Sequence, residues 1–117
     1  YEFKYIDENG IVIIDWRPVI RGVIKVLKHG VKKPEISLKF HDTICDMIKD
    51  VCVMLRKKYK IKKVCLSGGV FQNRYLSSSI RPALEKDGFD VYMHKMVPTH
   101  DGGIALGQAI LATTPTA

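Results

Sequence analysis

The sequence predicts a single α/β domain over residues 1–117, built on a mixed sheet in which parallel strands are extended by an N-terminal β-hairpin. Three observations support it. An Asn-Gly turn separates two short apolar segments, two long segments carry apolar residues at helical spacing, and the second half repeats a strand–helix order. A hydrophobic content of 46% with 26% charged residues is typical of a globular domain of this size.

The first half of the chain is expected to contain the hairpin and two helices. Strands at residues 3–7 and 11–15 flank the turn at Asn9-Gly10, which favours a tight hairpin. Asp15 can cap a helix that carries Pro18 in its first turn and ends at Gly30. After the break at Pro34, apolar residues at helical spacing predict a second helix over about residues 35–59.

The second half of the chain is expected to alternate strands and helices. Strands are predicted at residues 63–66 and 89–93, and helices at residues 71–86 and 103–112. Pro82 lies inside the first of these helices, where it should kink the helix or remove a hydrogen bond. The tail at residues 113–117 is expected to be loose.

Composition narrows the classes of protein to which the chain belongs. Cys45, Cys52 and Cys65 form no CxxC motif, so buried free thiols in a reducing cytoplasm are favoured over a zinc site. No apolar run approaches the roughly 20 residues that span a bilayer, and no signal peptide is recognisable. The sequence begins at Tyr1 and not at Met, so we expect it to be part of a longer cytoplasmic protein with no membrane partner.

The net charge of +7 is concentrated in one segment. Residues 56–63 contain six basic side chains in eight positions, which would suit a nucleic-acid surface. Cations are also favoured at the C-terminus of a long helix, where they interact with the helix dipole and with solvent. We favour this second interpretation, so nucleic acid is not the expected partner.

Two glycine-rich turns follow the predicted parallel strands, and these are the candidate site. One is Ser67-Gly68-Gly69-Val70, with Asn73 one turn further on, and the other is Asp101-Gly102-Gly103. Because ligands of such sheets bind beyond the C-terminal strand ends, the two turns would form a cleft for phosphate or ribose. Asp101 has two interpretations, a helix N-cap, which its position alone favours, or a ligand for a metal. These residues alone do not make a complete active site.

Three segments together resemble a known family. They are Lys39-Phe40-His41, LSGGVFQN at residues 66–73 and GFDVYMHKMVPTHDGGIALGQA at residues 88–109. The set resembles the C-terminal end of the HypF family of hydrogenase maturation carbamoyltransferases over essentially the whole chain. The related tRNA threonylcarbamoyltransferases share the fold but typically carry SGGVAAN and an Asp-Asn-Ala turn, so Phe71-Gln72 and Gly102-Gly103-Ile104 favour the HypF family.

The resemblance implies an actin-like (ASKHA, ribonuclease H-like) ATPase fold, with helices on both faces of the sheet, of which this chain would be the C-terminal lobe. In the family, acylphosphatase, zinc-finger-like and YrdC-like domains precede this one, and the YrdC-like domain makes carbamoyl-adenylate from carbamoyl phosphate and ATP. The carbamoyl group then passes to the C-terminal cysteine of HypE, as a step toward the cyanide ligands of [NiFe]-hydrogenase. The expected partners are these remaining domains and HypE.

The resemblance also implies roles for particular residues. Asp101 would ligate a divalent metal, iron or zinc, completed by two histidines outside this chain. The residues that would contact ATP or carbamoyl-adenylate are Ser67, Gly68, Gly69, Val70, Asn73, Gly102 and Gly103. His100 departs from the family pattern, which usually has Asn there, and this puts any role of that amide in question.

Two alternative functions stay open. One is a lobe of a tRNA-modifying threonylcarbamoyltransferase, which the basic segment would suit but the motif details oppose. The other is a non-catalytic lobe that binds nucleotide or docks on the remaining domains of the parent chain or on HypE. We expect the 117 residues alone to bind nucleotide weakly at best and to transfer nothing.

Overall fold

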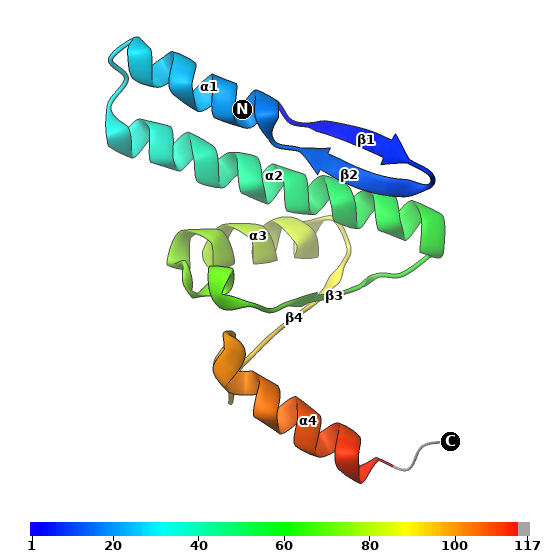
Figure 1. The fold of residues 1–117 in the computed structure, drawn as a ribbon. Coiled ribbons are helices and arrows are strands. Elements are labelled where there is room, and N and C mark those ends of the chain that lie inside the picture. The colour runs from blue at the N-terminus through cyan, green and yellow to red at the C-terminus, as the bar shows by residue number, and fades with distance from the viewer. Residues whose placement is uncertain (115–117) are drawn as a thin grey trace. The chain divides into compact units, whose positions relative to one another are not determined.

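The structure is a computed structural model that describes residues 1–114 (Figure 1). The chain forms two compact units, residues 1–51 and the residues from Cys52 onward, and the boundary falls inside the long helix α2 (Lys33–Tyr59). Each unit is described by itself, and the expectation of a single domain stays a prediction.

The first unit begins with the predicted β-hairpin. Strand β1 (Lys4–Glu8) pairs antiparallel with β2 (Ile11–Asp15), with Lys4 opposite Asp15 and Glu8 opposite Ile11. Asn9 and Gly10 both have positive φ, 56° and 83°, as a two-residue type I′ turn requires. The Gly10 N–H donates to the Asp7 carboxylate at 2.9 Å, which closes the turn.

Helix α1 (Arg17–Lys28) follows the hairpin, and its cap differs from the prediction. The N-cap residue is Trp16, whose side chain makes no capping hydrogen bond, and not Asp15. The Asp15 carboxylate still accepts the Arg17 backbone N–H at 3.0 Å and the Arg17 guanidinium at 2.8 Å. These hydrogen bonds, the side-chain one first, lower the pKa of Asp15. Asp15 is therefore the last residue of β2, and it stabilises the start of α1 from the position before the N-cap.

Helix α2 begins at Lys33, two residues earlier than predicted, because Pro34 is tolerated in the first turn of a helix. Val19 of α1 is fully buried, and the Trp16 and Phe40 rings lie 6.4 Å apart. Thr43 is a buried polar residue whose hydroxyl donates to the Lys39 carbonyl at 2.8 Å. The first unit is thus held by apolar contacts between the start of α1 and α2.

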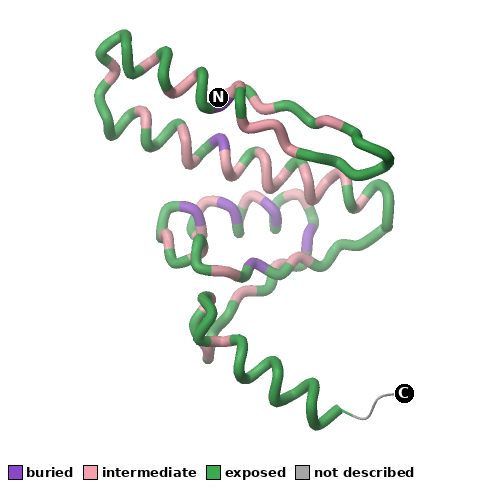
Figure 2. The backbone as a smooth tube through the Cα atoms, viewed as in Figure 1, coloured by how far each residue is buried: buried purple, intermediate pink, exposed green. Residues whose placement is uncertain are grey.

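The second unit contains a pair of parallel strands and helix α3 (Arg74–Lys86). Strand β3 (Lys63–Leu66) pairs with β4 (Asp90–Met93), with Lys63 opposite Asp90 and Leu66 opposite Met93. The buried core consists of one face of α3, the last residue of β3 and the residue before β4, and Figure 2 shows the buried positions recurring along α3. Its members are Leu66, Leu76, Ile80, Leu84 and Phe89.

One feature of the predicted sheet is wrong. The hairpin and the parallel pair form separate two-stranded sheets in the residues that the structure describes, so no mixed sheet joins them. Helices on both faces of the sheet stay a prediction, and within the second unit the alternate strand positions Lys63, Cys65, Asp90 and Tyr92 are exposed. Cys65 is therefore an exposed thiol and not a buried one, whereas Cys45 and Cys52 are half-buried, and all three are free.

The helices after each glycine turn begin later than predicted. A 3₁₀ turn, η1 (Gly69–Gln72), precedes α3, and a second, η2 (Asp101–Gly103), precedes α4 (Ile104–Thr113). Helix α3 continues through Pro82, which has no N–H to give to the helix ladder. Every residue of α4 is exposed, as Figure 2 shows along its length. Residues 115–117 of the predicted loose tail lie outside the described residues.

The basic segment closes α2 as predicted, and one of its members has a structural role. Arg56, Lys57 and Lys58 form the last turn of the helix. The Arg56 guanidinium lies 4.1 Å from the centre of the Phe89 ring and donates to the Asp87 carbonyl at 2.6 Å. Arg56 therefore packs within the fold.

In the part of the chain that the structure describes, no helix is long and apolar enough to cross a membrane.

Candidate functional site

The two glycine turns meet beyond the ends of the parallel strands, as the sequence predicts. Parallel pairing places Leu66 opposite Met93, so both strands end at the same edge of the sheet. The Gly68 N–H donates to the Thr99 carbonyl at 2.8 Å and ties the turns together. Between them lies a cavity of about 340 Å³, lined by Ser67, Gly68, His94, Thr99, His100, Asp101, Gly103 and Ile104.

The glycines of the first turn meet different requirements. Gly68 has φ 102° and ψ 157°, a conformation that essentially only glycine adopts. Gly69 does not have a positive φ, and a Cβ placed on it would come no nearer than 4.0 Å to His100. Neither backbone strain nor a neighbour within the described chain requires glycine at position 69. Its small size leaves room beside the cavity for something that approaches the backbone.

The second turn is capped by His100 and not by Asp101, so the N-cap interpretation of Asp101 is wrong. His100 is the N-cap of η2, and its Nδ1 accepts the Gly102 N–H at 3.0 Å. The N-cap of α4 is Gly103. An imidazole nitrogen that accepts a hydrogen bond can replace the side-chain oxygen of the Asn that the resemblance led us to expect. The substitution therefore preserves the turn.

Asp101 is left exposed with its carboxylate at the cavity. Among residues 1–114 it forms no hydrogen bond or ion pair through its side chain, and no group of three or more His, Cys, Asp or Glu side chains could hold a metal ion there. A carboxylate with no partner in its own chain is available as a hard oxygen ligand. It can supply one ligand of a metal site but cannot complete one.

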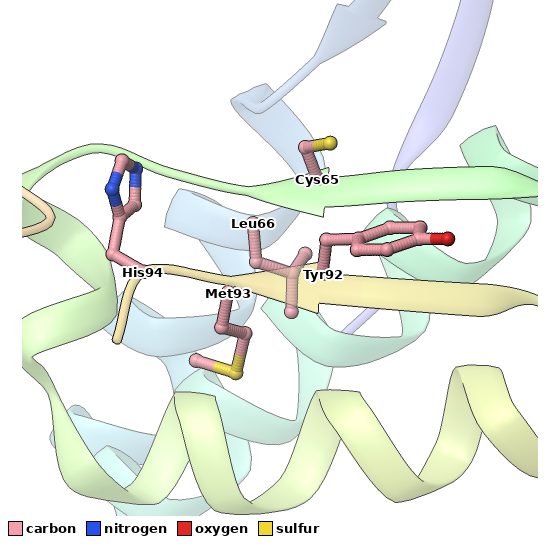
Figure 3. A pocket seen from close by; sticks show the side chains of 5 residues that line it. All are labelled: Cys65, Leu66, Tyr92, Met93 and His94. Atoms are coloured by element: carbon pink, nitrogen blue, oxygen red, sulfur yellow. The ribbon is translucent and has the colours of Figure 1, made fainter. Parts of the chain in front are cut away.

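His94 is the residue that the sequence reasoning missed. It follows β4 directly, and its Nε2 lies 2.8 Å from the Ser67 hydroxyl, across 27 residues of sequence. In Figure 3 the His94 ring stands at the end of β4, beside the end of β3. The only sequence signal is its place at a strand end equivalent to that of Ser67, since the pairing register sets the contact.

The other predicted site residues are distributed around the cavity. Ser67, Gly68, Asp101 and Gly103 line it, whereas Gly69, Val70, Asn73 and Gly102 do not. The Asn73 side-chain oxygen accepts the Leu76 N–H at 3.2 Å and caps α3. The amide oxygen of Asn73 is therefore used by the fold, and the contact of Asn73 with a nucleotide stays a prediction.

A second, shallower pocket shares His94 with this cavity. It is lined by Cys65, Leu66, Tyr92, Met93 and His94, and Figure 3 shows Met93 pointing toward the neighbouring helix and Cys65 pointing the other way. The lining is mostly apolar and provides few groups that could orient a substrate. Polar side chains that could orient a substrate converge instead on the cavity between the two glycine turns, the glycine-turn cavity.

Similarity to known proteins assigns this α/β chain to the class of Kae1-like domains. The crystal structure of full-length HypF in the phosphate- and nucleotide-bound form matches this chain with a TM-score of 0.92 and 41% sequence identity. The match covers 96% of this chain and 15% of that one. A tRNA N6-adenosine threonylcarbamoyltransferase from Burkholderia cenocepacia is 32% identical over 80 residues, which are 67% of this chain and 23% of that protein.

The family within this class is set by sequence. Residues 1–108 match the family model for the carbamoyltransferase Kae1-like domain, second subdomain, and the chain belongs to this family. The carbamoyltransferase HypF of Synechocystis is 35% identical over 97 residues, 83% of this chain. The matched region spans only 12% of that relative.

Proposed function

We propose that this chain forms one side of the nucleotide site of a carbamoyltransferase. The full protein would take the carbamoyl group from carbamoyl-adenylate, made from carbamoyl phosphate and ATP, and transfer it to the C-terminal cysteine of HypE during [NiFe]-hydrogenase maturation. The observation that carries the proposal is the cavity where two glycine turns meet beside the carboxylate of Asp101, which has no partner among residues 1–114. The similar full-length HypF has a phosphate- and nucleotide-bound form, which is consistent with the proposal.

The first turn would receive the nucleotide through its backbone and one hydroxyl. Gly68 takes the conformation that turns the chain, and the missing Cβ of Gly69 lets a ligand approach. Ser67 places a hydroxyl at the cavity, where it can donate to a phosphate or ribose oxygen. Uncharged donors of this kind bind anionic groups when they converge on a strand end.

Asp101 would ligate the divalent metal that the family implies, iron or zinc. The residues present fit this role in part, because a cavity-lining carboxylate without a partner in residues 1–114 is a suitable single ligand. The remaining ligands would be histidines outside this chain. When bound, such a metal supplies Lewis acidity toward the acyl phosphate and the leaving AMP.

The thiol nucleophile is expected from HypE and not from this chain. Burial raises the pKa of the Cys45 and Cys52 thiols, and the carboxylates of Asp42 and Asp46 raise the pKa of Cys45 further. Thiols with raised pKa values stay protonated and react slowly. Cys65 is exposed, but it lines the apolar pocket and not the glycine-turn cavity.

Two alternatives have some support of their own. The similarity to threonylcarbamoyltransferases fits a tRNA-modifying role, but Arg56 of the basic segment is engaged with Phe89 and Asp87, which reduces that surface. A docking role is favoured by α4, whose apolar side chains Ile104, Leu106, Ile110 and Leu111 are 50–76% exposed. Exposed apolar surface of this kind marks contact with other protein.

The test is an Asp101→Asn substitution in the full-length protein that contains this sequence. The amide keeps the size of the side chain but binds a metal far less well, so carbamoyl transfer to HypE should fall by about 100-fold or more, as when an electrostatic contact at the reaction centre is lost. Mass spectrometry of the HypE C-terminal peptide measures the transfer.

Asp90→Asn is the matched control, because Asp90 is an exposed carboxylate at the opposite end of β4. It should leave transfer unchanged. If Asp101→Asn transfers as well as the unmodified protein, the catalytic proposal fails and the docking role takes its place.

A further inference from the structure

The pair formed by Ser67 and His94 has a role that the family assignment does not supply. The two residues follow β3 and β4 directly, and both line the cavity that also contains Asp101. Their side chains meet at 2.8 Å between Ser67 Oγ and His94 Nε2. The hydrogen bond therefore joins the two strand ends at the place where the proposed nucleotide would bind.

The direction of this hydrogen bond depends on the His94 tautomer. When Nε2 carries the proton, His94 donates to Ser67 and leaves the serine O–H free to donate elsewhere. When Nδ1 carries the proton, Ser67 must donate to His94 and presents only lone pairs to the cavity. The tautomer of His94 thus decides whether Ser67 is a donor or an acceptor toward a ligand.

Nothing in residues 1–114 fixes this tautomer from the other side of the ring, because His94 Nδ1 has no hydrogen-bond partner there. His100, the other histidine of the cavity, differs. Its Nδ1 accepts the Gly102 N–H at 3.0 Å, so that nitrogen must be unprotonated for the turn to hold. The turn therefore fixes the protonation of His100 Nδ1, whereas the tautomer of His94 can change when a ligand binds.

We propose that His94 is a positioning residue that donates to Ser67 and thereby directs the Ser67 hydroxyl at a phosphate oxygen of the nucleotide. A phosphate oxygen only accepts hydrogen bonds, so a bound phosphate selects the arrangement in which the serine O–H points into the cavity. The position of Asp101 in the same cavity, as the proposed metal ligand at the phosphate, places the phosphate near Ser67. This inference rests on the proposed nucleotide site.

The first experiment compares AMP and adenosine binding by calorimetry in the full-length protein. His94→Leu removes the donor and should weaken AMP binding about tenfold, the scale of one hydrogen bond to a charged group. His94→Gln places an amide N–H near the position of Nε2 and should restore most of the affinity. Adenosine, which has no phosphate, should bind all variants alike and so shows that the cavity is intact.

Ser67→Ala should weaken AMP binding by a similar factor, and the double variant should lose no more than either single one. This non-additivity is expected when two residues act as one unit. His29→Leu is the matched control, since His29 lies in the first unit and bonds only to its own helix, at the Lys25 carbonyl. It should leave both affinities unchanged.

The second experiment reads the tautomer directly from the ¹⁵N signals of the His94 ring. Addition of AMP should give the pattern of a protonated Nε2, and adenosine should not. Equal AMP affinity of His94→Leu and the unmodified protein, or an unprotonated Nε2 in the AMP complex, would overturn the role of His94 while leaving the nucleotide site standing. If the unmodified protein binds neither ligand, the proposed function fails and this inference fails with it.

Discussion

Some residues at the strand ends stabilise the turns, and others face the cavity. Gly68, His100 and Asn73 are used by the fold, through a positive φ and two capping hydrogen bonds. Gly69, Asp101 and Ser67 are not needed in this way, and two of them line the cavity. Residues that the fold does not require are the better candidates for binding.

Gly68 and Gly69 make this distinction testable. Gly68→Ala forces a side chain into a conformation that costs about 1–3 kcal/mol, so the free energy of unfolding should fall by that amount. Gly69→Ala meets no strain and no close neighbour, so its effect should stay within about 0.5 kcal/mol. The two variants can be compared by chemical denaturation.

Gly69→Ala should have a large effect on nucleotide binding, in contrast to its small effect on the free energy of unfolding. The added methyl group occupies the approach to the backbone, so AMP binding to the full-length protein should be lost while stability is kept. If Gly69→Ala binds AMP normally, the space beside Gly69 is not part of the nucleotide site.

At the scale of elements, the second turn is held by contacts that a single methyl group would disturb. Gly103 has an ordinary helical φ of −85°, so alanine there suffers no backbone strain. A Cβ at this position would lie 2.8 Å from the Pro98 carbonyl oxygen, which belongs to the backbone and cannot easily move. Glycine is therefore needed at Gly103 for close packing of the turn against the start of α4.

Gly103→Ala should loosen η2 and the start of α4 by about 1–3 kcal/mol, the usual cost of overpacking. Gly107→Ala is the control in the same helix, because no atom of the described residues lies within 4 Å of its Cβ position. It should stabilise α4 by about 0.4–1 kcal/mol through the lower flexibility of the unfolded chain. Amide hydrogen exchange of α4 measures both effects, and equal protection in the two variants would contradict the packing argument.

The sequence predicts these elements well and their pairing less well. Each strand and helix of residues 1–114 lies within a few residues of its prediction, because turn residues and apolar spacing are local signals. The mixed sheet was wrong, since strand order depends on contacts between distant segments. Asp101 and His100 show the same limit. By residue type Asp101 is the preferred cap, and only the three-dimensional geometry assigns the cap to His100.

At the scale of the whole molecule, the features of the proposed site are incomplete in the residues that the structure describes. The parallel pair has an exposed face, α4 is exposed throughout, and the proposed ligand Asp101 has no companion ligands among residues 1–114. Relatives of which this region is 12–15% have more chain to supply the rest. The incomplete features all lie in the second unit.

Metal binding should therefore depend on the rest of the protein. If Asp101 is a metal ligand as proposed, residues 1–114 supply it without a group of further ligands, so the zinc affinity of the short chain should be more than about 100-fold weaker than that of the full-length protein, since losing outer-shell partners alone costs about 10- to 100-fold. Competition with a chelating dye measures both affinities, and Asp101→Asn in the full-length protein should bring its affinity toward that of the short chain. Tight zinc binding by the short chain that survives Asp101→Asn would mean that other residues hold the metal, and the role proposed for Asp101 would be lost.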